Sequence, residues 1–99
     1  MVVDESPDHR QMLGAYLSRS DYEVVEAASG AEALALCQMR KPDFILSDWL
    51  MAGMTGPELC RAVRKAQGDV HIYFILLTSK AEPEDIAFGL ESGADDFLT

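Results

Sequence analysis

The chain has 99 residues, of which 48% are hydrophobic and 25% charged, a composition typical of one globular domain and unlike that of a disordered or fibrous chain. Asp and Glu number 17 against 8 Lys and Arg, for a net charge of -9, which disfavours direct binding to the phosphates of a nucleic acid. The longest apolar run, residues 72–77, is too short to span a membrane, and the acidic start does not resemble a signal peptide. We therefore expect a cytoplasmic domain that binds neither membrane nor nucleic acid.

Short apolar segments alternate with amphipathic ones along the whole chain. The apolar residues 1–3 predict a first strand, and Ser6 followed by Pro7 predicts the cap and first turn of a helix that ends near residue 19. The apolar residues of this helix recur at spacings of three and four, which predicts that they share its buried face: Met12, Leu13, Tyr16 and Leu17.

The middle of the chain repeats this alternation. Residues 22–26 predict a second strand, and Ser29 with Glu32 has the spacing of a capping box for a helix that must end before Pro42. Residues 44–47 predict a third strand that delivers Asp48 at its end. Cys37 falls in the helix between these strands, as Cys60 does in the next one, and without metal or redox motifs both are predicted to be small core residues.

The last part of the chain predicts two further helices and two further strands. Thr55 and Glu58 again have capping-box spacing, and Leu59 and Val63 mark the buried face of a helix that Gly68 ends. The fully apolar segment 72–77 predicts a parallel strand buried on both faces and ending at Thr78. A final helix at 83–92, with Ile86 and Leu90 four residues apart, ends at Gly93 and precedes a strand at 97–99.

Five strands alternating with four helices predict an α/β fold with a doubly wound parallel sheet. Ligands of such sheets gather at the carboxyl ends of the strands, where this sequence places Asp4, Glu5, Asp48 and Thr78. In a flavodoxin-like strand order 2-1-3-4-5 the three carboxylates converge. Their mutual repulsion either raises their pKa values or is relieved by a hard cation, for which Mg²⁺ is the economical choice.

A carboxylate beside such a cation can act as a nucleophile toward phosphorus, and Asp48 is the candidate. Taken singly, each acid is better explained as a helix cap in a strand-to-helix turn. Three acids and one hydroxyl on separate strand ends of one sheet make a common site as good an explanation as separate caps.

Several segments together resemble the receiver domain of bacterial response regulators, and the resemblance runs in order through the whole chain. They are Val-Val-Asp-Glu at 2–5, Pro-Asp-Phe-Ile-Leu-Ser-Asp at 42–48, Met-Thr-Gly-Pro-Glu-Leu at 54–59, Leu-Thr-Ser at 77–79, and Gly-Leu-Glu-Ser-Gly-Ala-Asp-Asp-Phe-Leu at 89–98.

The resemblance implies that Asp48 accepts a phosphoryl group from a sensor histidine kinase or a phosphotransfer protein, and that this switches an output domain in the same parent chain. It further implies that Mg²⁺ is held by Asp4, Glu5, Asp48 and the backbone carbonyl of Leu50. The hydroxyl of Thr78 is implied to bind the phosphoryl group, and Thr78 with Phe97 to form the switch. Leu50 and Lys80 are implied to tune the rate of dephosphorylation.

The sequence also departs from the pattern of that family. Glu5 stands where a second aspartate is commoner, Ala52 replaces a usual proline, and Thr55 replaces a usual aspartate. The lysine expected directly after Thr99 and the fifth helix are not part of the sequence, so we expect residues 1–99 to be a receiver domain clipped at both ends and incomplete at its C-terminus.

The residues weigh against two other phosphate-related classes. A phosphatase of the haloacid-dehalogenase type needs an acid two residues after its nucleophile, where this chain has Leu50, and a flavodoxin-like cofactor binder needs an uncharged phosphate loop after the first strand, where it has Glu5. The alternative left open is a receiver-like interaction module that works without phosphorylation. Self-phosphorylation from small donors, self-dephosphorylation and a homodimer are also left open. His9 and His71 have no partner at catalytic or metal-binding spacing and are expected to have surface or loop roles.

Overall fold

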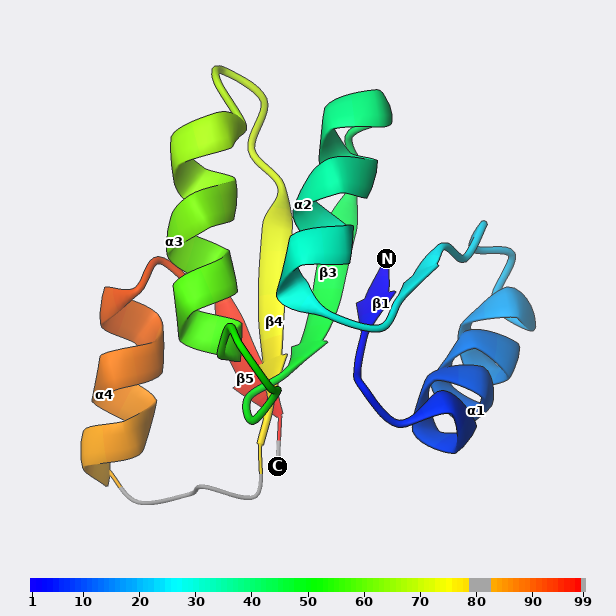
Figure 1. Cartoon of the computed structure of the whole chain (residues 1–99), viewed down its shortest axis with the longest axis horizontal. Coiled ribbons are helices and arrows are strands. Elements are labelled where there is room, and N and C mark those ends of the chain that lie inside the picture. Colours follow the sequence, from blue (N-terminus) through cyan, green and yellow to red (C-terminus); the bar gives the residue numbers. More distant parts are fainter. Residues whose placement is uncertain (79–82, 99) are drawn as a thin grey trace.

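The computed structural model describes residues 1–78 and 83–98 (Figure 1). Five parallel strands form one sheet in the order β2-β1-β3-β4-β5, which confirms the predicted doubly wound topology. The elements in chain order are β1 (Val2–Val3), α1 (Pro7–Ser18), β2 (Glu26–Ala27), α2 (Gly30–Met39), β3 (Phe44–Asp48), α3 (Gly56–Ala66), β4 (Tyr73–Leu77), α4 (Pro83–Glu91) and β5 (Asp96–Leu98).

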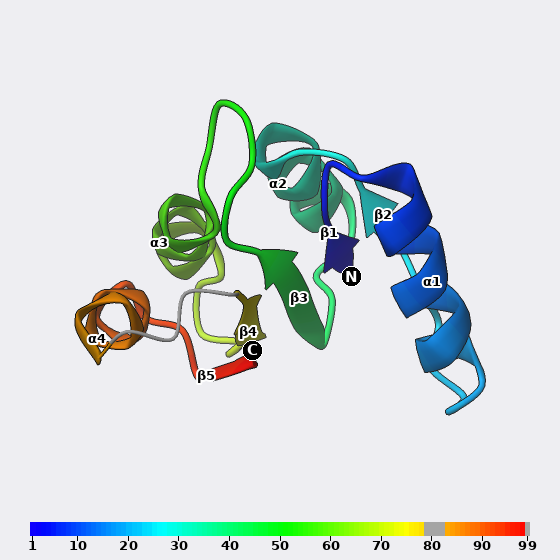
Figure 2. The same ribbon diagram turned by 90° about the horizontal axis from the view of Figure 1, so that it is seen from below.

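The helices lie on both faces of the sheet. Helices α2, α3 and α4 cover one face and α1 lies on the other (Figures 1 and 2). The main core fills the three-helix face, where side chains from β3 and β4 such as Ile45, Phe74 and Leu76 pack against Leu59 and Val63 of α3. This arrangement leaves the carboxyl ends of β1, β3 and β4 together at one edge.

Three helices begin at the caps that the sequence predicts. The side-chain oxygens of Ser6, Ser29 and Thr55 each accept a hydrogen bond from the backbone N–H three residues later. At Thr55 the capping box is complete, because the Glu58 carboxylate in turn accepts from the Thr55 N–H at 3.1 Å. Thr55 therefore keeps the cap although it departs from the family pattern.

The predicted buried face of α1 is partly wrong. Met12 is 60% exposed and Tyr16 is 72% exposed, whereas Leu13 and Leu17 are half-buried and Gly14 is buried. Helix α1 approaches β2 along the line of Gly14, where a Cβ would lie 3.4 Å from a methyl group of Val24. The residue at this contact is thus a glycine, which has no side chain. The spacing of the apolar residues therefore predicted a buried face about one position away from the observed one.

Two strands and one helix also differ from their predicted form. Strand β2 is confined to Glu26–Ala27 instead of residues 22–26, since only this short part pairs with β1. Burial along β4 alternates, with Phe74 and Leu76 buried and the odd-numbered residues exposed or half-buried, because no helix in the described ranges covers their face. In α4 the exposed Leu90 is not a core residue, whereas the neighbouring Gly89 is buried.

A polar cluster ties the amino ends of β4 and β5 to the end of α3. The Arg64 guanidinium donates to the Gly93 carbonyl at 2.9 and 2.7 Å and to the Asp95 carboxylate at 2.8 Å. Asp95 also accepts from the Phe74 N–H at 2.8 Å and pairs with His71 at 2.9 Å. The predicted surface position of His71 is confirmed, but it has an acidic partner.

Both cysteine thiols are free and buried, as predicted. Cys37 lies in α2 and Cys60 in α3, and burial is the main cause of the raised pKa of each thiol. Searched over residues 1–78 and 83–98, the chain contains no helix with the length and hydrophobicity needed to cross a membrane.

Candidate functional site

The register of the sheet brings two of the predicted acids together. Val2 pairs with Leu46 and Val3 with Ser47, so the next position on each strand places Asp4 opposite Asp48, with the two side chains toward the same face. Asp4 is only 2% exposed. Figure 2 looks onto this edge of the sheet, where the β1–α1 and β3–α3 connections leave the strands.

Asp4 is held by groups from the start of α1. One carboxylate oxygen accepts from the Ser6 N–H at 2.9 Å, and the other is in contact with Nδ1 of His9. The Arg10 guanidinium donates to the Asp4 backbone carbonyl at 2.7 Å. The prediction that His9 has no partner is therefore wrong. Because the helix begins directly after Ser6, its first turn folds His9 back onto the end of β1. The position of His9 in the first turn of the predicted helix was the feature of the sequence that could have indicated this contact.

Glu5 reaches in a different direction from Asp4. Its Oε2 atom accepts a hydrogen bond from the backbone N–H of Ala52, in the β3–α3 loop, at 3.1 Å. Both residues are exposed. The contact joins the carboxyl end of β1 to the loop that follows Asp48.

Asp48 is half-buried, and its Oδ1 atom accepts from the Trp49 N–H at 2.8 Å. Burial raises the pKa of the Asp48 carboxyl, and the negative charges of Asp4 and Glu5 raise it further, against the opposing effects of the Trp49 N–H and of His9. The charges of Asp4 and Glu5 thus act on the Asp48 carboxyl. The set of oxygen donors fits a hard divalent cation, which would relieve the repulsion between these charges.

The carboxylates are nevertheless engaged by protein partners in this conformation. Across the part of the chain that the structure describes, no three His, Cys, Asp or Glu side chains are grouped so as to hold a metal ion. Leu50, two residues after Asp48, is 60% exposed.

The remaining predicted residues lie around β4 and β5. Thr78 is 8% exposed directly after β4, and its N–H donates to the Leu98 carbonyl at 2.9 Å. Phe97 is half-buried against the core. Lys80 lies outside the described residues. The structure therefore places Thr78 at the strand edge that also carries Asp48.

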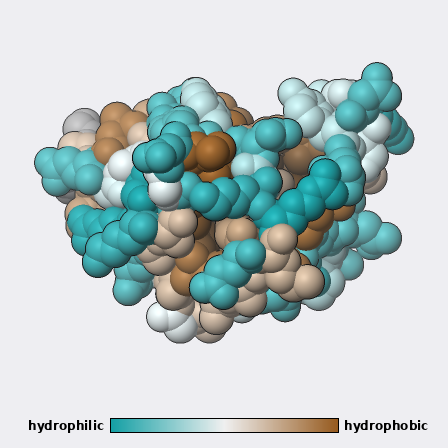
Figure 3. Space-filling model, turned by 90° about the horizontal axis from the view of Figure 1, so that it is seen from above, coloured by the Kyte–Doolittle hydropathy of each residue, from teal (hydrophilic) through white to brown (hydrophobic). Residues whose placement is uncertain are grey.

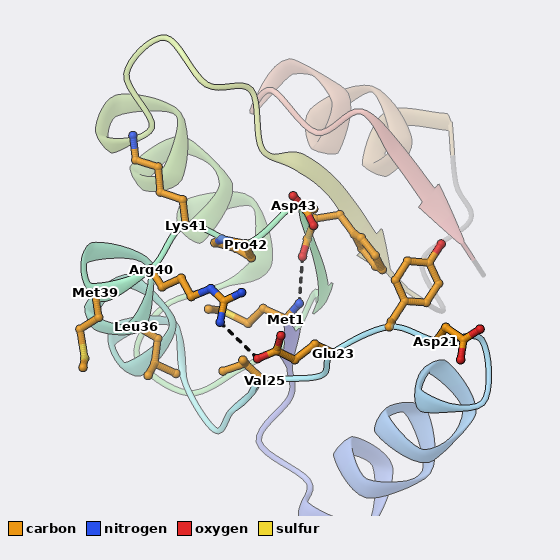
Figure 4. Close-up of a pocket in the computed structure, with 12 residues that line it drawn as sticks. Met1, Asp21, Glu23, Val25, Leu36, Met39, Arg40, Lys41, Pro42 and Asp43 are labelled. Atoms are coloured by element: carbon orange, nitrogen blue, oxygen red, sulfur yellow. Dashed lines mark hydrogen bonds and ion pairs between the residues drawn. The ribbon is translucent and has the colours of Figure 1, made fainter.

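A pocket on the molecule lies away from this edge, at the amino ends of the strands. It is lined by apolar side chains that include Met1, Val25 and Leu36, with the ion pair of Arg40 and Glu23 at 3.2 Å across it (Figure 4). Figure 3 views the molecule from the same end, where small apolar areas are separated by hydrophilic ones. The pocket includes none of the acids at the other edge.

A doubly wound sheet that places Asp4 opposite Asp48 at the carboxyl ends of neighbouring strands, with Thr78 at the end of the next strand, belongs to the class of α/β folds that bind ligands at this edge. The family described as response regulator receiver domain matches residues 1–99, and the chain belongs to that family. Receiver domains of this family are generally dependent on Mg²⁺.

Two curated relatives come from different bacteria. The chain is 39% identical over 99 residues to the phosphate regulon transcriptional regulatory protein PhoB of Pseudomonas aeruginosa, and 34% identical over 98 residues to the DNA-binding response regulator MtrA of Mycolicibacterium smegmatis. The matches cover 100% and 99% of this chain but only 43% and 42% of the relatives. The chain thus spans about two-fifths of their length.

Solved structures show the same fold. The chemotaxis protein CheY4 of Vibrio cholerae has a TM-score of 0.93 and 39% identity, with 99% of this chain and 82% of that chain covered. The receiver domain of the Francisella response regulator 1452 has a TM-score of 0.90 and 30% identity, with coverage of 99% and 79%.

Proposed function

We propose that Asp48 is the phosphoacceptor of this receiver domain. The observation that carries the proposal is the sheet register, which places Asp48 at the carboxyl end of β3 opposite the buried Asp4. Burial raises the pKa of Asp48, and the charges of Asp4 and Glu5 raise it further. A carboxylate in such surroundings attracts a divalent cation, and a bound cation can orient the carboxylate and the phosphoryl group for nucleophilic attack.

In the proposed reaction a carboxylate oxygen of Asp48 attacks the phosphorus of a phosphohistidine. An O–P bond forms as the N–P bond breaks, and the electron pair of that bond leaves with the imidazole. The carboxylates of Asp4, Glu5 and Asp48 with the carbonyl of Leu50 would hold Mg²⁺, which when bound neutralises charge on the phosphoryl oxygens. The Thr78 hydroxyl would donate to one of those oxygens, and Phe97 would follow it inward as the switch.

The donor in this proposal is a sensor histidine kinase or a phosphotransfer protein, and the receiver controls an output domain of the same parent chain in the cytoplasm. The relatives PhoB and MtrA support the output part, since they are named as transcriptional regulatory and DNA-binding proteins. Any direct DNA contact is proposed for the output domain and not for this acidic receiver. The tuning roles of Leu50 and Lys80 and a receiver homodimer are part of the same proposal.

The test is the intact mass of the chain after incubation with acetyl phosphate and Mg²⁺. We expect one phosphate adduct in the unchanged protein and none in Asp48→Asn. Asp43→Asn is the matched control, because Asp43 is exposed before the amino end of β3, and it should keep the adduct. An adduct that persists in Asp48→Asn moves the acceptor elsewhere, and a folded chain that never takes up phosphate favours the interaction module.

A further inference from the structure

We propose that Glu5 and the backbone N–H of Ala52 form a latch that holds the β3–α3 loop to the end of β1, and that the latch opens when Glu5 binds a divalent cation. This inference rests on the proposed metal site. It gives Ala52 a positioning role through its amide, and it makes the position of the loop dependent on the cation.

The loop has a closed base and a short exposed tip at Ala52 and Gly53. Its base is closed by the hydrogen bond from the Gly56 N–H to the Trp49 carbonyl at 2.8 Å, and the Trp49 side chain is buried. Its tip is a tight turn in which the Met54 N–H donates to the Ala52 carbonyl at 3.0 Å around Gly53, whose φ is +82°. A Cβ on Gly53 would meet nothing within 4 Å. Gly53 therefore projects from the loop, while Met51 is buried and Met54 packs against the core, and the Ala52 N–H to Glu5 bond at 3.1 Å links the exposed tip to β1.

The latch joins two residues that depart from the family pattern. Glu5 is one methylene longer than the commoner aspartate, and this extra length lets the carboxylate reach across to the loop. Ala52 has a backbone N–H, which the usual proline lacks. With proline at 52 the donor is absent, and with aspartate at 5 the acceptor is shorter. The two departures therefore make one contact.

Binding of a cation requires Glu5 to move. Mg²⁺ demands ligands in near-octahedral geometry at about 2.0 to 2.1 Å, whereas over the described residues no three acids or imidazoles are so grouped. Glu5 is turned toward Ala52 in this conformation. A carboxylate that joins Asp48 around a cation must leave the amide, and the loop tip then loses its link to β1.

The experiment is a calorimetric Mg²⁺ titration of the chain and four variants. Ala52→Pro removes the amide donor and should bind Mg²⁺ about two- to tenfold more tightly, as expected for loss of one competing hydrogen bond. Ala52→Ser keeps the N–H and is the matched control with unchanged affinity. In the Glu5→Asp background, adding Ala52→Pro should change the affinity no further, because the latch is already absent.

Hydrogen exchange provides a second readout that does not depend on how Ala52→Pro folds. The Ala52 amide should be protected in the metal-free chain and should exchange faster after Mg²⁺ is added, or without Mg²⁺ in Glu5→Asp. Equal Mg²⁺ affinities for the chain and Ala52→Pro, or an unprotected Ala52 amide, overturn the latch alone. If no variant binds Mg²⁺, both the latch and the metal part of the proposed function are overturned.

Discussion

Asp48 and Asp95 have pKa values shifted in opposite directions. Burial raises the pKa of Asp48, and the charge of Asp4 adds to this effect. Burial also acts to raise the pKa of Asp95, but hydrogen bonds from the Phe74 N–H, His71 and Arg64 outweigh it, so the pKa of Asp95 is lowered. Folding therefore favours the protonated form of one carboxyl and the ionised form of the other.

Replacing each of them with asparagine should change stability in opposite directions. For Asp48 the folded state loses stability as pH rises from about 3.9, the ordinary aspartate pKa, through the raised value. Asp48→Asn should therefore melt a few degrees higher than the unchanged chain at neutral pH without divalent cations, and this gain should vanish below about pH 3.9.

For Asp95 the contribution to stability is complete above the ordinary aspartate pKa and is lost as pH falls through the lowered value. Asp95→Asn should melt lower at neutral pH, and the difference should narrow in acid. Thermal melts of both variants across this pH range provide the check. Shifts of the same sign in the two variants would contradict the electrostatic interpretation.

Leu50 stands beside the proposed phosphoacceptor with an exposed side chain that cannot hydrogen-bond to an attacking water. Leu50→Asn introduces an amide that can orient such a water and should shorten the lifetime of the phosphoryl group severalfold. Leu50→Ala removes the same apolar bulk without adding an amide and should not. The decay of the adduct mass over time measures both. Equal decay in both variants would remove residue 50 from the hydrolysis step.

At the scale of the elements, what could be predicted from sequence depended on how local the cause was. The caps at Ser29 and Thr55 involve residues three apart, so their spacing alone was sufficient. The contact of His9 with Asp4 depends on the direction in which α1 leaves β1, and the alternating burial of β4 depends on which helices cover each face. Neither feature can be predicted from the residues of the segment itself, and both were seen only in the tertiary structure.

Two glycines within helices differ in the space that a side chain would have, and this difference provides a prediction. A Cβ on Gly89 of α4 would lie 2.9 Å from the Trp49 ring and 3.0 Å from Leu76, so Gly89→Ala should push α4 from the sheet and destabilise the chain by about 1 to 3 kcal/mol.

Gly14 of α1 is the matched control. A Cβ there meets Val24 and Glu26 at ordinary contact distances of 3.4 and 3.5 Å, so Gly14→Ala should be neutral or stabilise by up to about 1 kcal/mol. Urea unfolding of both variants compares them. A Gly89→Ala chain as stable as the Gly14→Ala chain would show that α4 can shift to accommodate the methyl group without loss of stability.

At the scale of the whole molecule, the two faces of the sheet are unequally covered. Side chains of β4 and β5 that face away from α3 and α4 include the exposed Tyr73 and Leu98, with Ile75 and Leu77 half-buried between them. Contiguous apolar surface of this kind promotes association.

We expect sedimentation of residues 1–99 to depend on concentration, and the double variant Tyr73→Thr with Leu98→Thr to remain monomeric at higher concentration. Threonine preserves the preference for a strand at both positions. Val70→Thr, at an apolar position in the α3–β4 loop that is more exposed than Tyr73 and Leu98, is the control and should associate like the unchanged chain. If Val70→Thr lowers association as much as the double variant does, the exposed sheet face is not the cause.

The two buried thiols can report on local opening of the domain. Alkylating reagents react with the thiolate, and burial makes the thiolate of Cys37 and of Cys60 both scarce and inaccessible in the native state. Modification then requires an opening event, and its rate measures how often α2 or α3 detaches from the sheet. Equal rates at the two sites would mean that these helices open in one cooperative event, and a faster rate at Cys37 would mean that α2 detaches while α3 stays in place.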